Sequence, residues 1–391
     1  MTPGAPGRRA STYSKLKSVV QKPVYLDYQA TTPLDERVLD AMLPYLRGKF
    51  GNAASRTHQF GWEAEKAVDF ARKRVATLAG AGPREIVFTS GATESNNLAI
   101  KGARGHVVTV ATEHRAVLDP AGPSATIVPV DRDGLVSVEE LRRAIRPDTV
   151  LVSVMYANNE VGTIQPVAAI GAMCRERGVL FHCDAAQAFG KIPVDVQRDS
   201  IDLMSISAHK LYGPKGVGAL YVRRGVKLAA QMEGGGHEGG LRSGTLNVPG
   251  IVGFGAACTI ARDEMADEAE RVGALRDRLQ LRLTTELDQV RVNGALAARL
   301  PGNLNVTFGW VAADSLLMAL PDLALSTGSA CSSAESKPSH VLTAMGRSLE
   351  EARSSVRFGL GRFTTAEEVE YAAARVIEAV GRLRALSTLM P

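Results

Sequence analysis

Cysteine is scarce in this sequence, with four residues in a chain of 391. The four form no CxxC pair and have no regular spacing, which excludes a disulfide-stapled scaffold and gives no metal site. We therefore expect a reducing, cytoplasmic compartment. Long apolar runs are missing too, because stretches such as 149–157 fall far short of the roughly 18 residues that a membrane span needs. We expect no membrane segment.

A charge excess is missing from most of the chain. The formal net charge of +5 arises in residues 1–22, which hold five basic residues and no acidic one, while the remainder carries 41 of each sign. A neutral body offers no general surface for polyanions, so we expect no direct binding to nucleic acid. We interpret residues 1–22 as a flexible basic tail. A nucleic-acid-binding module would rest on that tail alone.

The sequence does contain a regular alternation of short β-rich runs and longer amphipathic runs. Buried strands are predicted at 86–89, 107–111, 126–130, 149–155, 179–183, 203–207 and 217–222. Helices are predicted at 62–79, 138–145, 167–177, 251–288 and 365–386. Strands joined by helical crossovers imply an α/β fold with a mostly parallel seven-stranded sheet, covered on both faces.

This pattern divides the chain into a large sheet domain and a smaller one. We place the large domain at 35–262 and build a smaller α+β domain from 23–34 and 263–391. Parallel sheets bind ligands beyond the carboxyl ends of their strands. The residues that directly follow each strand are therefore the candidates for chemistry.

Two post-strand segments carry ionisable groups. Lys210 follows a buried strand in a glycine-rich turn, where desolvation favours a neutral amine that can form a Schiff base. The alternative is a lysine that reaches solvent at the strand end. Asp184 ends another strand, with Gln187 three residues on. A carboxylate can keep a pyridine nitrogen protonated and an amide can donate to a phenolic oxygen, although Asp184 could instead cap a helix.

Two further segments point to a phosphate and to a planar ring. At 89–96 a strand runs into small and hydroxyl residues that begin a helix, where backbone N–H groups and Thr93 could bind phosphate. The alternative is a capping box that only starts the helix. His114 follows a third strand and could stack on a cofactor and exchange protons with it. A lone histidine of this kind is more often structural.

In these segments the chain resembles the pyridoxal-phosphate-dependent cysteine desulfurases, of the type that supplies sulfur for iron–sulfur cluster assembly. The resemblance implies the fold of type I pyridoxal-phosphate transferases and covers nearly all of 24–390. Its motifs are YLDYQATTP (25–33), TSGATES (89–95), NNEVG (158–162), DAAQ (184–187), SAHKLYGPKG (207–216), GGGHE (234–238), RSGT (242–245) and STGSAC (326–331).

The resemblance implies a role for each matching residue. Lys210 would form the Schiff base and move protons, Asp184 would bind the ring nitrogen and Gln187 the phenolic oxygen. The remaining implied roles are His114 stacking on the ring as a catalytic group, Ala92, Thr93, Ser207 and His209 around the phosphate, Asn159 near the substrate, and Arg357 on the substrate carboxylate. Thr245 would reach the phosphate of the neighbouring subunit, which implies a homodimer with shared active sites.

Cys331 would carry the sulfur as a persulfide. It lies in a stretch, 327–337, that holds no large apolar residue, whereas Cys174, Cys183 and Cys258 have the apolar surroundings of core residues. An incidental exposed thiol is the alternative. The implied reaction converts L-cysteine to L-alanine and passes sulfur to an acceptor protein for iron–sulfur clusters, tRNA thiolation or DNA phosphorothioation.

Other readings of the sequence stay open. A selenocysteine lyase, or another lyase or transaminase of the same fold, would not need Cys331. A non-catalytic scaffold would be expected to lack Lys210 or Asp184. The chain also departs from the usual family pattern at Ala53, Gly239 and Gly359, and the version with Ala53 is similar to desulfurases that serve DNA phosphorothioation.

Overall fold

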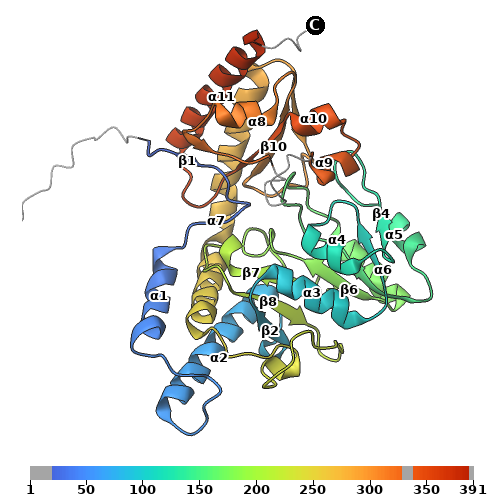
Figure 1. The fold of residues 1–391 in the computed structure, drawn as a ribbon, viewed down its shortest axis with the longest axis vertical. Helices are drawn as coiled ribbons and strands as arrows, with labels where there is room; N and C mark the ends of the chain where they lie inside the picture. Colours follow the sequence, from blue (N-terminus) through green and yellow to red (C-terminus); the bar gives the residue numbers. More distant parts are fainter. Residues whose placement is uncertain (1–19, 328–337, 387–391) are drawn as a thin grey trace, which may run out of the picture.

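The computed structural model describes residues 20–327 and 338–386. Its largest sheet has seven strands in the order β2-β8-β7-β6-β5-β3-β4. Strand β8 runs antiparallel to β2 and β7, and every other pairing in this sheet is parallel. The predicted α/β class with a mostly parallel seven-stranded sheet is confirmed (Figure 1).

The strands lie where the apolar runs predicted them. Their bounds are β2 Ile86–Thr89, β3 His106–Val110, β4 Thr126–Val128, β5 Thr149–Ser153, β6 Leu180–Asp184, β7 Leu203–Ser207 and β8 Gly218–Val222. Strands β2 and β7 match the predicted ranges at both ends. The other five differ from them by one or two residues at one end or at both. The runs were readable because these strands are buried on both faces, so apolar residues occupy consecutive positions.

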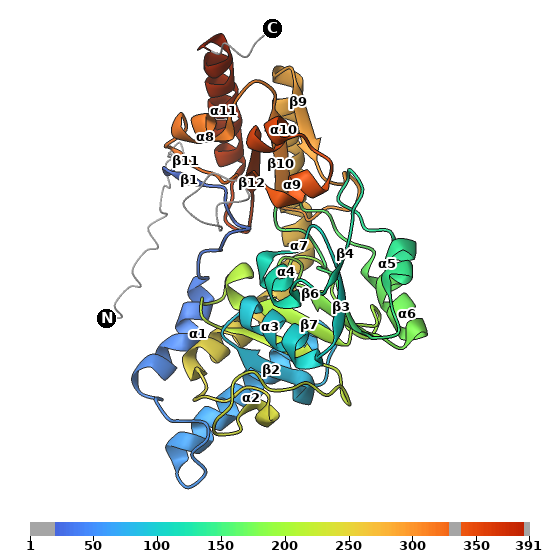
Figure 2. The same cartoon turned by 45° about the vertical axis from the view of Figure 1, so that its right-hand side comes forward.

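Helices cover both faces of this sheet (Figure 2). They are α1 Glu36–Arg47, α2 Gln59–Ala79, α3 Ala92–Ala103, α4 Arg115–Ala121, α5 Val138–Ala144, α6 Val167–Arg177 and α7 Val248–Glu286. Neighbouring residues of one strand enter different cores: Phe88 packs in the cluster with α2 and α7, and Val87 packs in the cluster with α3 and α4. The period-two alternation of a strand thus supplies two cores at once. Helices α1 and α4 had no counterpart in the sequence prediction.

A second hydrophobic core surrounds a three-stranded antiparallel sheet in the order β12-β10-β9. Its elements are β9 Val290–Asn293, β10 Asn303–Phe308, β12 Ser355–Gly359, α8 Ala313–Met318 and α11 Ala366–Leu386. Helices α9 His340–Ala344 and α10 Leu349–Arg353 pack in a smaller separate cluster with Val161. Strand β1, Val24–Tyr25, pairs in parallel with β11, Leu323–Ala324.

Helix α7 connects the two cores. Phe254, near its start, is buried in the core of the large sheet, whereas Leu279 is buried in the second core. The domain boundary predicted near residue 262 falls inside this 39-residue helix and stays a prediction. Within the described ranges, the helices are all too short or too polar to cross a membrane.

Candidate active site

A cavity of about 560 Å³ lies at the carboxyl ends of the parallel strands. Ten predicted site residues line it: Ala92, Thr93, His114, Asn159, Asp184, Gln187, Ser207, His209, Lys210 and Arg357. Nine lie at the ends of β6 and β7 or in the segments that follow β2, β3, β5, β6 and β7, and one comes from β12 of the second sheet. The sheet edge brings these segments together because parallel strands end on the same side.

Two predicted site residues are not placed in this cavity. Thr245 is exposed on the surface of the chain and does not line the cavity. Cys331 lies outside the described residues.

Lys210 is held by backbone carbonyls from a segment near residue 30, far from it in the sequence. It ends a short 3-10 turn, Ala208–Lys210, that directly follows β7. Its Nζ donates to the carbonyl oxygens of Gln29 at 2.5 Å and Ala30 at 2.7 Å. The amine is therefore turned into the cavity instead of reaching solvent. The sequence analysis assigned no role to Gln29 or Ala30, since a backbone acceptor leaves no side-chain signal.

Asp184 is a buried carboxylate with two fixed hydrogen-bond donors. The Nδ2 group of Asn96, on α3, donates to its Oδ2 at 2.7 Å, and the backbone N–H of Ala186 donates to its Oδ1 at 2.9 Å. No helix begins at Asp184 in the described chain, so its alternative reading as a helix cap is wrong. Asn96, which the sequence analysis also left without a role, orients this carboxylate. Its position next to the 89–95 motif was the available signal.

His114 combines a structural and a site position. It precedes α4, and its Nδ1 accepts the backbone N–H of Ala116 at 3.0 Å. Desolvation lowers the pKa of the imidazole, with Asp184 opposing this effect and Lys210 reinforcing it. A neutral ring whose Nδ1 accepts carries its proton on Nε2. His114 is exposed where it borders the cavity, so a planar group could stack on it.

The start of α3 also lines the cavity. Gly91 precedes the helix with φ of 154°, and Ala92 and Thr93 make its first turn. A Cβ atom at Gly218 would lie only 2.7 Å from the Gly91 Cα, so the backbones approach each other as only glycine permits. The amide N–H groups of this 12-residue helix can bind phosphate.

His209 lines the same cavity. Its Nδ1 is 3.0 Å from the Thr31 Oγ1. Burial lowers the pKa of His209 to about 4, and the positive charges of Lys210, Lys215 and Lys191 act in the same direction. The ring is therefore neutral at pH 7 and can offer a hydrogen bond without adding charge.

Arg357 brings a buried guanidinium from β12 to the cavity. Its Nη2 donates to Asp27 Oδ1 at 2.6 Å and its Nη1 donates to the Asn159 carbonyl at 2.9 Å. The Nε group is buried and has no hydrogen-bond partner in the described chain. A guanidinium fixed in this way keeps N–H groups for a carboxylate, which it can bind through two parallel hydrogen bonds.

The three described thiols are core residues, as predicted. Cys174, Cys183 and Cys258 are all buried. Burial raises the pKa of Cys174 to about 12 and raises those of the other two well above their ordinary range. Such thiols stay protonated and are poor nucleophiles.

The residues around the cavity fit pyridoxal phosphate. An amine, a buried carboxylate with fixed donors, an amide, an imidazole and a helix N-terminus all line this cavity. The cofactor needs these groups for its aldehyde, ring nitrogen, phenolic oxygen, ring face and phosphate. The described residues hold no cluster of three or more side chains suited to a metal ion.

The chain is similar to known proteins along almost its whole length. The sequence matches the aminotransferase class-V family over residues 24–372, so the chain belongs to that family. It is 58% identical over 382 residues to cysteine desulfurase IscS of Anaeromyxobacter sp. (strain Fw109-5), covering 94% of this chain and 95% of that protein. Within the class-V family, the chain belongs with the cysteine desulfurases.

Solved structures agree with this placement. A NifS-like protein superposes with a TM-score of 0.86 at 38% identity, covering 93% of this chain and 100% of that one. The structure of SspA in complex with cysteine superposes with a TM-score of 0.77 at 38% identity, covering 88% of this chain and 100% of that one.

Proposed function

We propose that this protein converts L-cysteine to L-alanine with pyridoxal phosphate and retains the sulfur as a persulfide on Cys331. The observation that carries the proposal is the cavity in which Lys210, Asp184 and Arg357 converge from distant parts of the chain. An amine, a ring-nitrogen partner and a carboxylate binder are the groups that amino-acid chemistry on this cofactor requires.

The cofactor, when bound, supplies an electron sink for the Cα–H bond of the substrate. Asp184 would bind its ring nitrogen, Gln187 its phenolic oxygen and His114 its ring face. The phosphate would lie against Ala92, Thr93, Ser207 and His209. These are the roles that the resemblance implies, and they are supported by the presence of all these residues around one cavity and by the hydrogen-bond capacity of each group.

Arg357 and Lys210 would act on different groups of the substrate. Arg357 would bind the carboxylate of L-cysteine, and Asn159, whose carbonyl already fixes Arg357, would border the substrate. Lys210 would remove the Cα proton and deliver it to another atom of the substrate–cofactor system. An amine at the end of a flexible side chain can reach both positions. His114, neutral with its proton on Nε2, is the second group that could hold a proton at the cavity.

Cys331 would carry the sulfur. Its thiolate attacks the substrate sulfur, an S–S bond forms, and the Cβ–S bond breaks. The electron pair of the broken bond stays on Cβ, which takes up a proton and becomes the methyl group of alanine. One cysteine and one enzyme thiol thus yield one alanine and one persulfide, with no external oxidant.

We further propose a homodimer and a protein acceptor. Thr245, exposed on the isolated chain, would reach the phosphate held by the neighbouring subunit and complete its site. The high identity to proteins named IscS supports iron–sulfur cluster assembly as the use of the sulfur, ahead of tRNA thiolation or DNA phosphorothioation.

The test is alanine release from L-cysteine, with excess thiol reductant, by the natural protein and by Cys331→Ala. Alanine from the natural protein alone would support sulfur transfer through Cys331. Alanine from both would leave the cofactor chemistry intact and favour a lyase, with selenocysteine as the next substrate to assay. Absence of alanine from a dimeric, cofactor-loaded natural protein would refute the proposed substrate. Lys210→Ala should abolish turnover in every case.

A further inference from the structure

The side-chain amide of Gln187 has two ends that cannot exchange roles, since Oε1 only accepts hydrogen bonds and Nε2 only donates them. Its Nε2 donates to the carbonyl oxygen of Gln29 at 3.0 Å, and its Oε1 accepts from the Nζ of Lys191 at 3.2 Å. A lysine amine approaches as a donor and a carbonyl only accepts. These two neighbours therefore fix the amide with its N–H groups turned away from Lys191.

The chain delivers Lys191 to this position through a tight turn after β6. The backbone N–H of Lys191 donates to the carbonyl of Ala188 at 2.9 Å. Gly190 has φ of 76°, and a Cβ atom there would lie 3.1 Å from Leu211 Cδ1. Glycine fits this backbone conformation at little cost. The turn thus holds Lys191 on the same side as Gln187, four residues earlier.

The hydrogen bond to Gln187 is the one side-chain contact in the described chain that uses the amine of Lys191. It is partly buried beside a small cavity that Gln29, Tyr212 and Glu268 also line. Within the described ranges it forms no ion pair, and Gln187 Oε1 is its only side-chain hydrogen-bond partner. An amine buried without a carboxylate is costly to keep charged.

The charges around Lys191 reinforce this cost. Burial lowers its pKa to about 7, and the positive charges of Lys210 and Arg357 act in the same direction, while Glu268 opposes them. An amine with a pKa of about 7 is only partly charged at neutral pH, and it donates a hydrogen bond in either protonation state. It can therefore hold Gln187 without placing a full second charge beside Lys210.

We propose that Lys191 is a positioning residue that turns the Gln187 amide N–H toward the phenolic oxygen of the cofactor. Through this hydrogen bond it lowers the proton affinity of the nitrogen that joins Lys210 to the cofactor. The inference rests on the proposed function, because it requires pyridoxal phosphate with its phenolic oxygen at Gln187. One Nε2 proton is bound by Gln29, and the second has no partner in the described chain. A donor at a phenolate reduces the basicity of that oxygen, which then holds the proton of the neighbouring nitrogen less tightly.

The experiment follows the visible absorbance of the cofactor-loaded protein against pH. Lys191→Met and Gln187→Ala should each raise the pH midpoint of the absorbance change, by about one pH unit for the loss of one hydrogen bond to a charged oxygen. Lys191→Arg keeps the donor and should restore a midpoint near that of the natural protein.

A double-mutant cycle separates positioning from a direct charge effect. If Lys191 acts through Gln187, adding Lys191→Met to Gln187→Ala leaves the midpoint unchanged. Lys215→Met is the matched control. Like Gln187, Lys215 lines the cavity of about 560 Å³, but in the described chain it makes no contact with Gln187, so its effect should add to that of Gln187→Ala.

Two outcomes would overturn the inference. The first is an additive shift for Lys191→Met, which would show that its charge acts directly on Lys210. The second is an unshifted midpoint in the single variant. Both leave the proposed function standing, whereas a natural protein that gains no visible absorbance from pyridoxal phosphate would refute the proposed function itself.

Discussion

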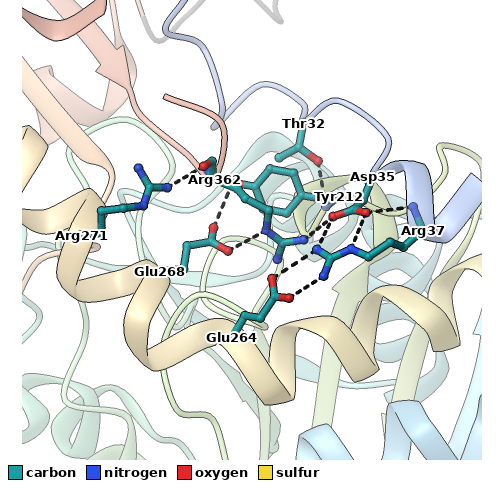
Figure 3. A network of polar contacts seen from close by, with 8 residues as sticks. All are labelled: Thr32, Asp35, Arg37, Tyr212, Glu264, Glu268, Arg271 and Arg362. Atoms are coloured by element: carbon teal, nitrogen blue, oxygen red, sulfur yellow. Dashed lines mark hydrogen bonds and ion pairs between the residues drawn. The ribbon is translucent and has the colours of Figure 1, made fainter. Parts of the chain in front are cut away.

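Arg362 lies at the centre of an ion-pair cluster beside the Lys210 turn (Figure 3). Its side chain is only 10% exposed, and it donates to Asp35 Oδ2 at 2.7 Å and to Glu268 Oε2 at 2.8 Å. The guanidinium also lies 4.2 Å from the ring centre of Tyr212, two residues after Lys210. The cluster therefore connects the end of β12 with α7 and with the turn that carries the proposed catalytic amine.

We predict that Arg362→Met lowers the free energy of unfolding by about 3 kcal/mol. Asp35 would keep a cation, because Arg37 donates to the same carboxylate at 2.8 Å. Within the described part of the chain, the Glu268 carboxylate would keep only the hydrogen bond from the Tyr212 hydroxyl at 3.0 Å. Breaking a buried pair costs roughly 3–5 kcal/mol. The lower end applies because one carboxylate, itself 16% exposed, loses the only ion-pair partner that it has among the described residues.

Arg37→Met is the matched control. The Arg37 side chain is 52% exposed, and when it is removed Asp35 still has Arg362. Its loss should cost less than about 1 kcal/mol, as for exposed ion pairs. The assay is urea unfolding of both variants and the natural protein at one fixed protein concentration, because a dimer unfolds in a concentration-dependent way. A cost for Arg362→Met no larger than that of Arg37→Met would refute the reasoning.

Three more predictions follow from single contacts. A hydrogen bond from Arg37 lowers the pKa of Asp35 from 3.8 to about 2, so Asp35→Asn should cost about 2 kcal/mol at pH 7. In urea unfolding, that cost should shrink as the pH falls from about 4 toward 2, because the stabilisation is lost once the folded carboxyl is protonated. Asn96→Ala removes the donor to the carboxylate that ends β6, and absorbance titration should show about tenfold weaker binding of pyridoxal phosphate. Gly218→Ala places a Cβ atom 2.5 Å from a backbone carbonyl and should cost about 1–3 kcal/mol, whereas Gly273→Ala, with open space around it, should not destabilise.

The strands could be predicted because their signal is local. In a strand such as β7, Leu203–Ser207, every residue is buried, and the run is visible in the sequence without knowledge of its partners. Helix α4 was missed for a local reason as well. It has seven residues with Pro120 among them, and both features argue against a helix when only the sequence is read.

The site could be predicted as far as its residues follow strands. Asp184 ends β6, and Lys210 ends the short turn that follows β7. These two strands are adjacent and parallel, so the convergence of the two residues follows from the topology. Gln29 was beyond reach for a physical reason. It acts on Lys210 and Gln187 through its backbone carbonyl, which every residue type possesses.

The segment 24–35 explains how residues of the two cores come to act on one substrate. Near its start, Asp27 binds Arg357 of β12, and in its middle the carbonyls of Gln29 and Ala30 accept from Lys210. The backbone N–H and the Oγ1 hydroxyl of Thr32 both donate to the carbonyl of His209 in the same turn. A segment bonded at both sides sets the separation between the proposed carboxylate binder and the proposed catalytic amine. Because those two groups must meet the carboxylate and the Cα of one small amino acid, this separation has to be held fixed, and short hydrogen bonds to buried groups hold it.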